Sequence, residues 1–176
     1  MENKVAWHAG KSKWKKLKNL NSYSIGIELV NKGHQWGYEN FSNLQIKTLI
    51  SLCLNLKKKY KIKNENFLGH SDIAPLRKLD PGEKFPWKKL SKFGIGIWYK
   101  AKIENVKIQK SKRNDLFFNN LNKIGYRYFS LRKRTNKDKM IVKAFQRRYY
   151  SHKVDGFIDQ KTLNISQFLA NQQNLS

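Results

Sequence analysis

The chain has 176 residues, of which 39% are hydrophobic and 13% aromatic, enough for a packed core, so an intrinsically disordered protein is excluded. Its 37 Lys and Arg residues exceed its 12 Asp and Glu residues, and the net charge of +25 would attract nucleic acid, anionic lipid or an anionic wall polymer. The single cysteine, Cys53, excludes an internal disulfide, and no apolar run reaches the ~20 residues of a membrane-spanning helix.

The N-terminal part of the chain contains one predicted strand. The first residues, MENKVAWHAGKSKWKK, have no apolar stretch after their charges, so no export signal is predicted. Residues 24–30, SIGIELV, are aliphatic and lie between asparagine-containing turn signals, which predicts a buried strand. Glu28 lies inside this run. A carboxylate there indicates either a wrong assignment or a functional group with a shifted pKa.

Residues 42–60 are the clearest predicted helix. Ser42 and Gln45 match a capping box, and an apolar stripe follows. Cys53 lies on that stripe and is predicted to be a small buried hydrophobe. Residues 67–69 are predicted to end a strand, and residues 85–90 to form a short helix.

The stretch between them, residues 69–82 (GHSDIAPLRKLDPG), is predicted to be a rigid irregular loop. All three prolines of the chain, Pro75, Pro81 and Pro86, fall in this stretch or just after it. Rigid loops with ionisable side chains often carry functional sites. A surface loop with solvated charges is the alternative.

Four ionisable residues could form a hydrolytic site. His70 and Asp80 have the donor groups that Zn²⁺ prefers. Lys78 would project to the same side as Asp80 and could stabilise an oxyanion. Glu28 could transfer a proton to a leaving amine. The alternative is a structural Lys78–Asp80 ion pair, a capping His70 and a solvent-facing Glu28, and the residues alone leave both open.

The pattern changes beyond residue 99. Residues 99–115 have few apolar side chains and are predicted to be a linker or an edge strand. Three amphipathic helices follow, at residues 116–124, after the capping pattern at Thr135, and after Asp159. They predict a small bundle near the lower size limit for an independent core. We therefore expect a domain boundary near residue 110.

Several stretches resemble one known architecture: WHAGKSKW, LNSYSIGIELVN, LGHSDIAPLRKLDPGEKFPWKKLSKFGIGIW and VKAFQRRYYSHKVDGFIDQKTL. The chain resembles the type 2 N-acetylmuramoyl-L-alanine amidases, most closely those with a C-terminal peptidoglycan-binding domain. The resemblance implies an α/β amidase domain over residues 1–110, with a mixed central sheet and flanking helices. It implies a small all-α three-helix peptidoglycan-binding domain over residues 111–176.

The resemblance also implies an activity and roles for residues. The activity is zinc-dependent hydrolysis of the amide between N-acetylmuramic acid and L-alanine, with peptidoglycan or muropeptides as partners. His70 matches the second zinc histidine and Asp80 the carboxylate ligand. Glu28 matches the catalytic glutamate, and Lys78 matches the lysine near the scissile carbonyl.

Trp7 and His8, in the WHAG motif, are expected to line the substrate groove. Family members carry the first zinc histidine on a strand before this motif, so we expect an N-terminally truncated amidase domain. With only His70 and Asp80 as ligands, the chain alone is expected to bind Zn²⁺ weakly and to show little activity.

Two other functions remain open at this stage. One is a catalytically inactive peptidoglycan-binding protein. The other is a basic nucleic-acid-binding protein, which only the charge suggests, because no recognised nucleic-acid motif is present. The amidase resemblance implies a monomer of the cell envelope, periplasmic or secreted, with no membrane span and no specific nucleic acid.

Overall fold

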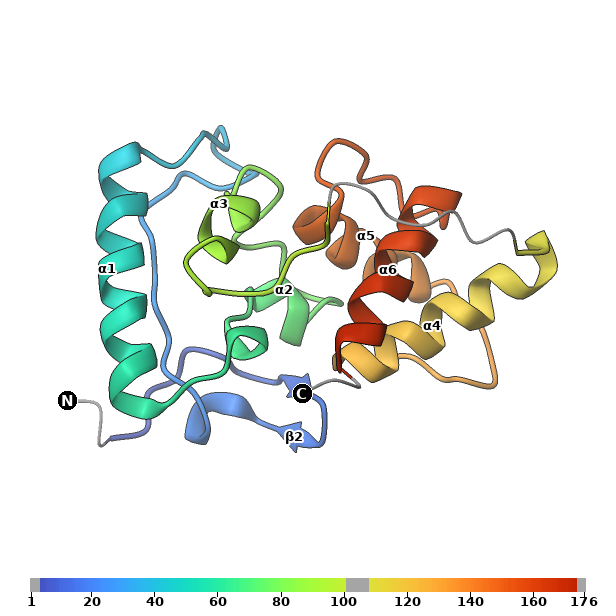
Figure 1. The fold of residues 1–176 in the computed structure, drawn as a ribbon, viewed down its shortest axis with the longest axis horizontal. Helices are drawn as coiled ribbons and strands as arrows, with labels where there is room; N and C mark the ends of the chain where they lie inside the picture. Colours follow the sequence, from blue (N-terminus) through green and yellow to red (C-terminus); the bar gives the residue numbers. More distant parts are fainter. Residues whose placement is uncertain (1–3, 101–107, 174–176) are drawn as a thin grey trace.

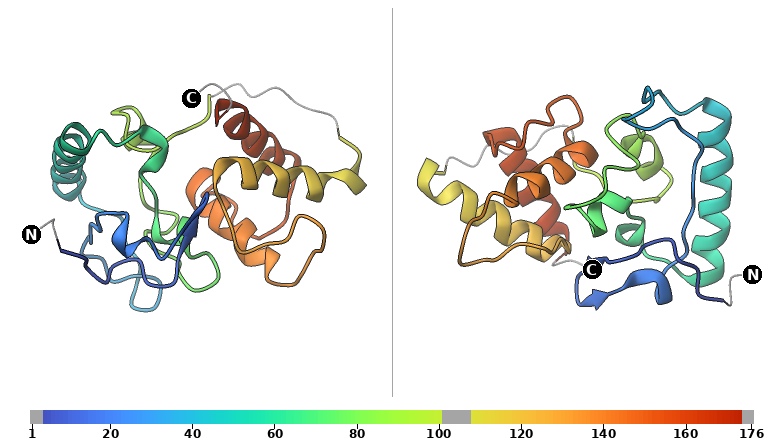
Figure 2. Two further views of the ribbon diagram at one scale, coloured as in Figure 1. Left: turned by 90° about the horizontal axis from the view of Figure 1, so that it is seen from below. Right: turned by 180° about the vertical axis from the view of Figure 1, so that it is seen from behind.

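The computed structural model describes residues 4–100 and 108–173, whose regular secondary structure is mainly helical (Figure 1). In chain order the elements are β1 (Lys13–Trp14), β2 (Leu17–Lys18), η1 (Leu20–Ser22), α1 (Asn43–Tyr60), η2 (Asn64–Asn66), α2 (His70–Ile73), α3 (Trp87–Ser91), η3 (Lys110–Lys112), α4 (Arg113–Ile124), α5 (Asp138–Tyr149) and α6 (Gln160–Gln172). Helix α1 lies at one end of the molecule and α4, α5 and α6 gather at the other, with α2 and α3 between them (Figures 1 and 2). Within those two ranges, no helix combines the length and the apolar character needed to cross a membrane.

A short antiparallel hairpin is the only sheet among the described residues. In it, Lys13 lies opposite Lys18 and Trp14 opposite Leu17. The mixed central sheet expected from the family resemblance is therefore not present in this part of the chain.

Residues 24–30, predicted to be a buried strand, form an extended segment that is mostly exposed. Ile25 and Ile27 are 40% and 36% exposed, and Val30 is 90% exposed. No backbone hydrogen bond is made by residues 25–29 within the described ranges. The prediction of a buried strand is wrong. An apolar sequence favours a strand inside a sheet, but burial also needs neighbouring strands, and none lies beside this segment in the described chain.

Helix α1 agrees with its predicted signals. The Ser42 hydroxyl accepts a hydrogen bond from the Gln45 amide at 3.1 Å, and the Gln45 side chain accepts one from the Ser42 amide at 2.9 Å, which completes the capping box. Cys53 is buried on the apolar stripe, and burial raises the pKa of its thiol to about 11. This stripe packs against residues that follow α2, among them Trp87 and Leu90 of α3.

The C-terminal helices follow several local signals, but α4 begins at Arg113 and not at the predicted residue 116. The prediction of a linker or edge strand over residues 99–115 is therefore wrong for residues 110–115, which are helical, and its residues 101–107 lie outside the described ranges. Helix α4 ends at Gly125, whose φ of 135° is accessible mainly to glycine. The Thr135 amide donates to the Asp138 carboxylate at 3.2 Å at the start of α5. The Thr162 amide donates to Asp159 Oδ1 at 2.8 Å, which caps α6.

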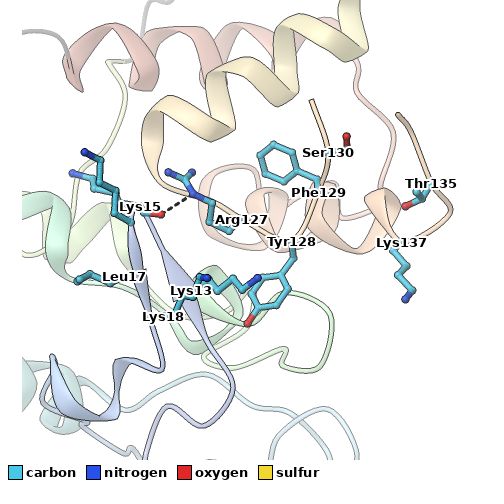
Figure 3. A pocket seen from close by; sticks show the side chains of 11 residues that line it. Lys13, Lys15, Leu17, Lys18, Arg127, Tyr128, Phe129, Ser130, Thr135 and Lys137 are labelled. Atoms are coloured by element: carbon cyan, nitrogen blue, oxygen red, sulfur yellow. Dashed lines mark hydrogen bonds between the residues drawn. The ribbon is translucent and has the colours of Figure 1, made fainter. Parts of the chain in front are cut away.

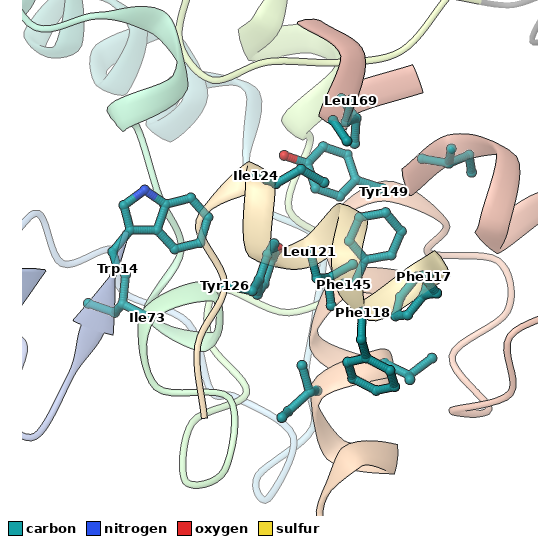
Figure 4. Packing of buried hydrophobic residues seen from close by; sticks show 14 of the residues in the cluster. Trp14, Ile73, Phe117, Phe118, Leu121, Ile124, Tyr126, Phe145, Tyr149 and Leu169 are labelled. Carbon is teal, nitrogen blue, oxygen red and sulfur yellow. The ribbon is translucent and has the colours of Figure 1, made fainter. Parts of the chain in front are cut away.

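These helices share one buried core with the N-terminal part (Figure 4). Trp14 of β1 lies edge-on to Tyr126, with ring centroids 5.0 Å apart. Ile73 of α2 belongs to the same cluster as Phe145 of α5. Apolar packing therefore crosses the predicted boundary near residue 110. Whether residues 111–176 fold alone stays a prediction.

Candidate active site

Of the two residues predicted to bind a metal, His70 begins a one-turn helix, α2 (His70–Ile73), and Asp80 lies in the loop that follows it. The Gly69 amide donates to Asp72 Oδ2 at 2.7 Å and so stabilises the start of this turn. The prediction of a fully irregular loop is therefore wrong for α2, and the strand end predicted at residues 67–69 is not formed. The Ser71 amide donates to the Asp80 carbonyl at 2.9 Å, which brings Asp80 back to His70.

His70 and Asp80 face each other. His70 Nδ1 lies 3.0 Å from Asp80 Oδ2, and His70 Nε2 lies 3.2 Å from the carbonyl oxygen of Ala9. The ring proton can lie on Nδ1, which then donates to Asp80 while Nε2 accepts from Arg77, or on Nε2, which then donates to Ala9. Burial alone would raise the pKa of Asp80, but the hydrogen bond and charge of His70, and then the charge of Lys78, lower it below its usual value.

This donor set partly fits a zinc ion. A zinc-ligating histidine usually donates its second ring N–H to a carbonyl or carboxylate, and the Ala9 carbonyl lies 3.2 Å from His70 Nε2, where it can accept one. Imidazole and carboxylate are both good Zn²⁺ ligands, whereas a catalytic zinc usually has three protein ligands. Across residues 4–100 and 108–173, no group of three or more His, Cys, Asp or Glu side chains is placed to hold a metal. The imidazole and carboxylate groups are therefore suitable zinc ligands, but the described residues bring only two such groups together.

Arg77 holds the Ala9 segment against His70. Its Nη2 donates to the Ala9 carbonyl, its Nε donates to the Lys11 carbonyl at 3.2 Å, and Nη2 lies 3.3 Å from His70 Nε2. Arg77 therefore helps to orient the carbonyl that fixes the His70 ring. The sequence analysis missed this residue, although its place between α2 and Asp80 was an available signal.

The two residues predicted to be catalytic occupy different surroundings. The positive charge of Lys78 contributes to the low pKa of Asp80, so its ammonium lies within electrostatic reach of that carboxylate. Glu28 is exposed on the extended segment 24–30. Among the described residues, no hydrogen bond or ion pair joins Glu28 to His70 or Asp80.

His8 contacts the start of that segment, and Trp7 precedes it in the chain. Trp7 is 91% exposed. The His8 ring nitrogens lie 2.9 Å from the Ala6 carbonyl and 2.9 Å from the Ser24 hydroxyl. A Cβ atom at Gly26 would come within 2.6 Å of His8 Cβ, so this close approach requires glycine. Both ring nitrogens of His8 are thus engaged by groups other than His70 and Asp80.

A second loop supports the turn after Asp80. The Tyr38 hydroxyl donates to the Pro81 carbonyl at 2.7 Å and accepts from the Lys84 amide at 2.9 Å. Burial, the main cause, raises the pKa of Tyr38 to about 12. His34 stacks on Tyr38 at 4.4 Å and pairs with Glu83 at 2.9 Å. The sequence analysis missed this support, because nothing local links residues 34–38 to residues 81–84.

Asp72 anchors α2 from the other side. This carboxylate is 1% exposed, accepts from the Tyr126 hydroxyl at 2.5 Å, and pairs with Arg148 of α5. Arg148 also donates to the Phe67 carbonyl at 2.9 Å and lies over the Trp87 ring at 3.9 Å. The candidate site is thereby tied to the C-terminal helices through a buried ion pair.

Known proteins similar in sequence to this chain are described as amidases. The profile of the N-acetylmuramoyl-L-alanine amidase family matches residues 1–83. N-acetylmuramoyl-L-alanine amidase AmiD of Escherichia coli is 46% identical over 109 residues, which cover 59% of this chain and 40% of that relative. 1,6-Anhydro-N-acetylmuramyl-L-alanine amidase AmpD of Haemophilus influenzae is 39% identical over 88 residues, which cover 49% of this chain and 46% of that relative. The matched part thus spans less than half the length of these curated relatives.

Solved structures are similar over nearly the whole chain. AmiD of E. coli, in complex with the substrate anhydro-N-acetylmuramic acid-L-Ala-D-gamma-Glu-L-Lys, has a TM-score of 0.84 at 32% identity, covering 98% of this chain and 70% of that chain. AmpDH3 of Pseudomonas aeruginosa has a TM-score of 0.86 at 31% identity, covering 98% of this chain and 71% of that chain. This level of identity and coverage shows common descent as well as a common fold. The chain therefore belongs to the N-acetylmuramoyl-L-alanine amidase family.

Proposed function

We propose that this chain is a zinc-dependent amidase that cleaves the amide between N-acetylmuramic acid and L-alanine in peptidoglycan. Enzymes of this family generally depend on zinc. The observation that carries the proposal is the 3.0 Å approach of His70 Nδ1 to Asp80 Oδ2, with His70 Nε2 on the Ala9 carbonyl. This is the arrangement expected of two zinc ligands and the outer partner of one of them.

In this proposal each residue has a separate task. His70 and Asp80 would hold Zn²⁺, which would supply a Lewis acid for the hydrolysis. Glu28 takes a proton from the attacking water and returns it to the leaving amine nitrogen of L-alanine. The Lys78 ammonium stabilises negative charge on the carbonyl oxygen of the scissile amide.

The substrate class in the proposal is anhydro-muropeptides. Support comes from the similar structure of E. coli AmiD, which is described as a complex with an anhydro-N-acetylmuramic acid peptide. Trp7, 91% exposed beside His8, would offer an aromatic face to the sugar or peptide. Residues 111–176 would bind peptidoglycan, and both similar structures have a counterpart for them because they cover 98% of this chain.

A second candidate is a peptidoglycan-binding protein without amidase activity. The observation that favours it is the number of metal donors, since the described residues bring together two where catalytic zinc sites usually have three. In this case the chain would bind peptidoglycan through α4, α5 and α6 and would not retain zinc.

One experiment separates the two candidates. The purified chain is loaded with Zn²⁺, dialysed and analysed for metal by mass spectrometry. It is then incubated with anhydro-N-acetylmuramic acid-L-Ala-D-γ-Glu-L-Lys, and release of the peptide is followed by liquid chromatography. Bound zinc with chelator-sensitive release supports the amidase, whereas pelleting with sacculi without zinc or release supports the inactive binder.

The matched control is Glu28→Gln, which removes the proposed proton acceptor and keeps the shape of the side chain. In the amidase proposal this variant retains zinc and loses most of the release. Equal release by this variant and the unchanged protein would contradict the role of Glu28.

A further inference from the structure

A basic pocket lies between the β1–β2 hairpin and residues 127–137 (Figure 3). Its volume is about 680 Å³, within the usual range for small-molecule sites. None of the residues in the proposed amidase mechanism lines it. The lining residues include no Asp or Glu, and the cationic ones are Lys13, Lys15, Lys16, Lys18, Arg127 and Lys137.

Arg127 is held in place by backbone carbonyls, with no carboxylate partner in the described part of the chain. Its Nε donates to the Lys15 carbonyl at 2.7 Å, and its Nη1 donates to the carbonyls of Asn122 and Tyr126 at 3.0 and 2.7 Å. Burial lowers the pKa of this guanidinium. By contrast, Arg148 pairs with Asp72. A partly buried cation whose charge the described residues leave uncompensated favours an external anion.

The aromatic wall of the pocket positions a second cation. Lys13 Nζ lies 5.1 Å from the centre of the Tyr128 ring, and Figure 3 shows the lysine extended toward that ring. Tyr128 has a φ of 75°, a left-handed conformation that is costly for an aromatic residue. Such strain is concentrated at functional sites in proteins. The pocket therefore has both ordered cations and a backbone outlier in its wall.

A second lysine-lined hollow provides the comparison. It lies at the end of α1 and is lined by Lys57, Lys58, Lys61 and Lys63, together with Glu65. Among its lining residues are a carboxylate and no aromatic ring. Lys15 of the basic pocket lies 4.0 Å from Glu65. The other five cations of the pocket form no ion pair with an Asp or Glu of residues 4–100 or 108–173.

We propose that the basic pocket binds a ligand that carries two or more phosphate groups. Guanidinium and ammonium groups donate charge-assisted hydrogen bonds to phosphate oxygens. A single carboxylate would leave most of the cations unpaired, whereas clustered phosphates would match several at once. The phosphates can belong to a free oligophosphate or to neighbouring headgroups of an anionic lipid surface. Nucleic acid fits less well, because the cations surround one cavity, whereas strand binding needs a long basic track.

The test compares two variants of the full chain with equal loss of charge. The pocket variant is Lys13→Gln/Lys16→Gln/Lys18→Gln, and the control is Lys58→Gln/Lys61→Gln/Lys63→Gln. Tripolyphosphate binding is measured by calorimetry, and vesicle binding by sedimentation with phosphatidylcholine, with and without phosphatidylglycerol. The pocket variant should weaken binding by about tenfold relative to the control, equivalent to about 1.4 kcal/mol.

The results show whether the pocket binds phosphate groups and whether these belong to a free oligophosphate or to lipid headgroups. Pocket-dependent binding of tripolyphosphate indicates a free oligophosphate, and pocket-dependent binding of phosphatidylglycerol vesicles alone indicates lipid headgroups. Equal weakening by both variants would mean that net charge alone attracts the anion, and the proposal fails. Pocket-dependent binding of duplex DNA without either phosphate probe would also overturn it.

A pair of single substitutions tests the proposal even if the triple variants do not fold. Lys16→Glu changes one exposed residue of the pocket, and Lys58→Glu is its match on α1. Both variants should keep the thermal melting curve of the unchanged protein. Only Lys16→Glu should weaken binding of the phosphate probe, and no difference between the two would contradict the proposal.

Discussion

His70 Nδ1 and Asp80 Oδ2 approach to 3.0 Å, while Nε2 of the same ring contacts the Ala9 carbonyl at 3.2 Å. Two positions of the ring proton are compatible with these contacts. In one, Nδ1 donates to Asp80 and Nε2 accepts from Arg77 Nη2, 3.3 Å away. In the other, Nε2 donates to the Ala9 carbonyl, which leaves Nδ1 and Asp80 Oδ2 as two facing acceptors that the proposed zinc would join.

The first prediction concerns the metal donors. His70→Ala and Asp80→Ala should each abolish retained zinc, because either change leaves a single donor of the pair. His152→Ala is the control, since His152 is an exposed histidine on a different loop. Metal analysis after dialysis is the measurement, and equal zinc loss in the control would argue against a specific site.

Arg77 should act on the metal through the Ala9 carbonyl. Arg77→Ala removes the contacts to Ala9 and Lys11, so the His70 ring loses part of its orientation. Zinc affinity should fall by about 10–100-fold, as for other outer partners of ligating histidines. Competition with a chromogenic chelator measures this, with the exposed Arg132→Ala as control. Unchanged zinc affinity in Arg77→Ala would show that the contacts of Arg77 with Ala9 and Lys11 do not contribute to zinc binding.

Lys78 is predicted to affect turnover without affecting metal. Lys78→Ala should keep zinc and lower kcat by about 10²–10³-fold, the range seen when one oxyanion donor is removed. The exposed Lys88→Ala controls for the loss of one positive charge. If Lys78→Ala raised KM and left kcat unchanged, Lys78 would be a binding residue and not an oxyanion donor.

Arg148 should matter far more in the whole chain than in an isolated helical fragment. In the whole chain, Arg148→Met leaves the Asp72 carboxylate buried without its partner and should lower the free energy of unfolding by about 3–5 kcal/mol. A fragment of residues 112–176 lacks Asp72, Phe67 and Trp87, so the same change there should be worth less than about 1 kcal/mol. Urea unfolding followed by circular dichroism measures both. A fragment with a random-coil spectrum would end the prediction of an autonomous domain.

The cap of α6 predicts a dependence of stability on pH. Burial alone would raise the pKa of Asp159, but hydrogen bonds from Lys153 and Thr162 lower it below its usual value. Because the pKa is lower in the folded protein, the ionised cap stabilises the fold above the unfolded pKa of about 4 and is lost as pH falls through the folded value. Asp159→Ala should lower the free energy of unfolding by about 0.5–2 kcal/mol at neutral pH, and less in acid. A pH-independent difference would contradict an ionised cap.

Local signals were sufficient for several helices. The Ser42 capping box and the Asp159 cap lie within three residues of the groups they bind, so the sequence alone predicts where α1 and α6 begin. His70, Lys78 and Asp80 were also found from one short stretch. The residues alone did not distinguish a zinc site from a structural ion pair, because spacing in a loop does not determine which side chains converge. The family resemblance favoured the zinc site.

Long-range partners could not be predicted in this way. Asp72 and Arg148 are 76 positions apart, and Tyr38 and Pro81 are 43 apart, so no local pattern joins them. The extended segment 24–30 shows the opposite error. Its composition is typical of a central strand, but a strand forms only where a neighbouring strand can pair with it. The composition of the segment gives no information about such a neighbour.

That extended segment has a consequence for handling the protein. Both backbone edges of residues 25–29 are unpaired in the described chain, and Ile25 and Ile27 are exposed, which are the features of a surface that pairs with other chains. Two copies that meet there must each bring a net charge of +25. Electrostatic repulsion between like molecules would therefore protect the open edges at low ionic strength, and added salt would screen it. The molecule should be most soluble in dilute buffer, and high salt should promote its association edge to edge.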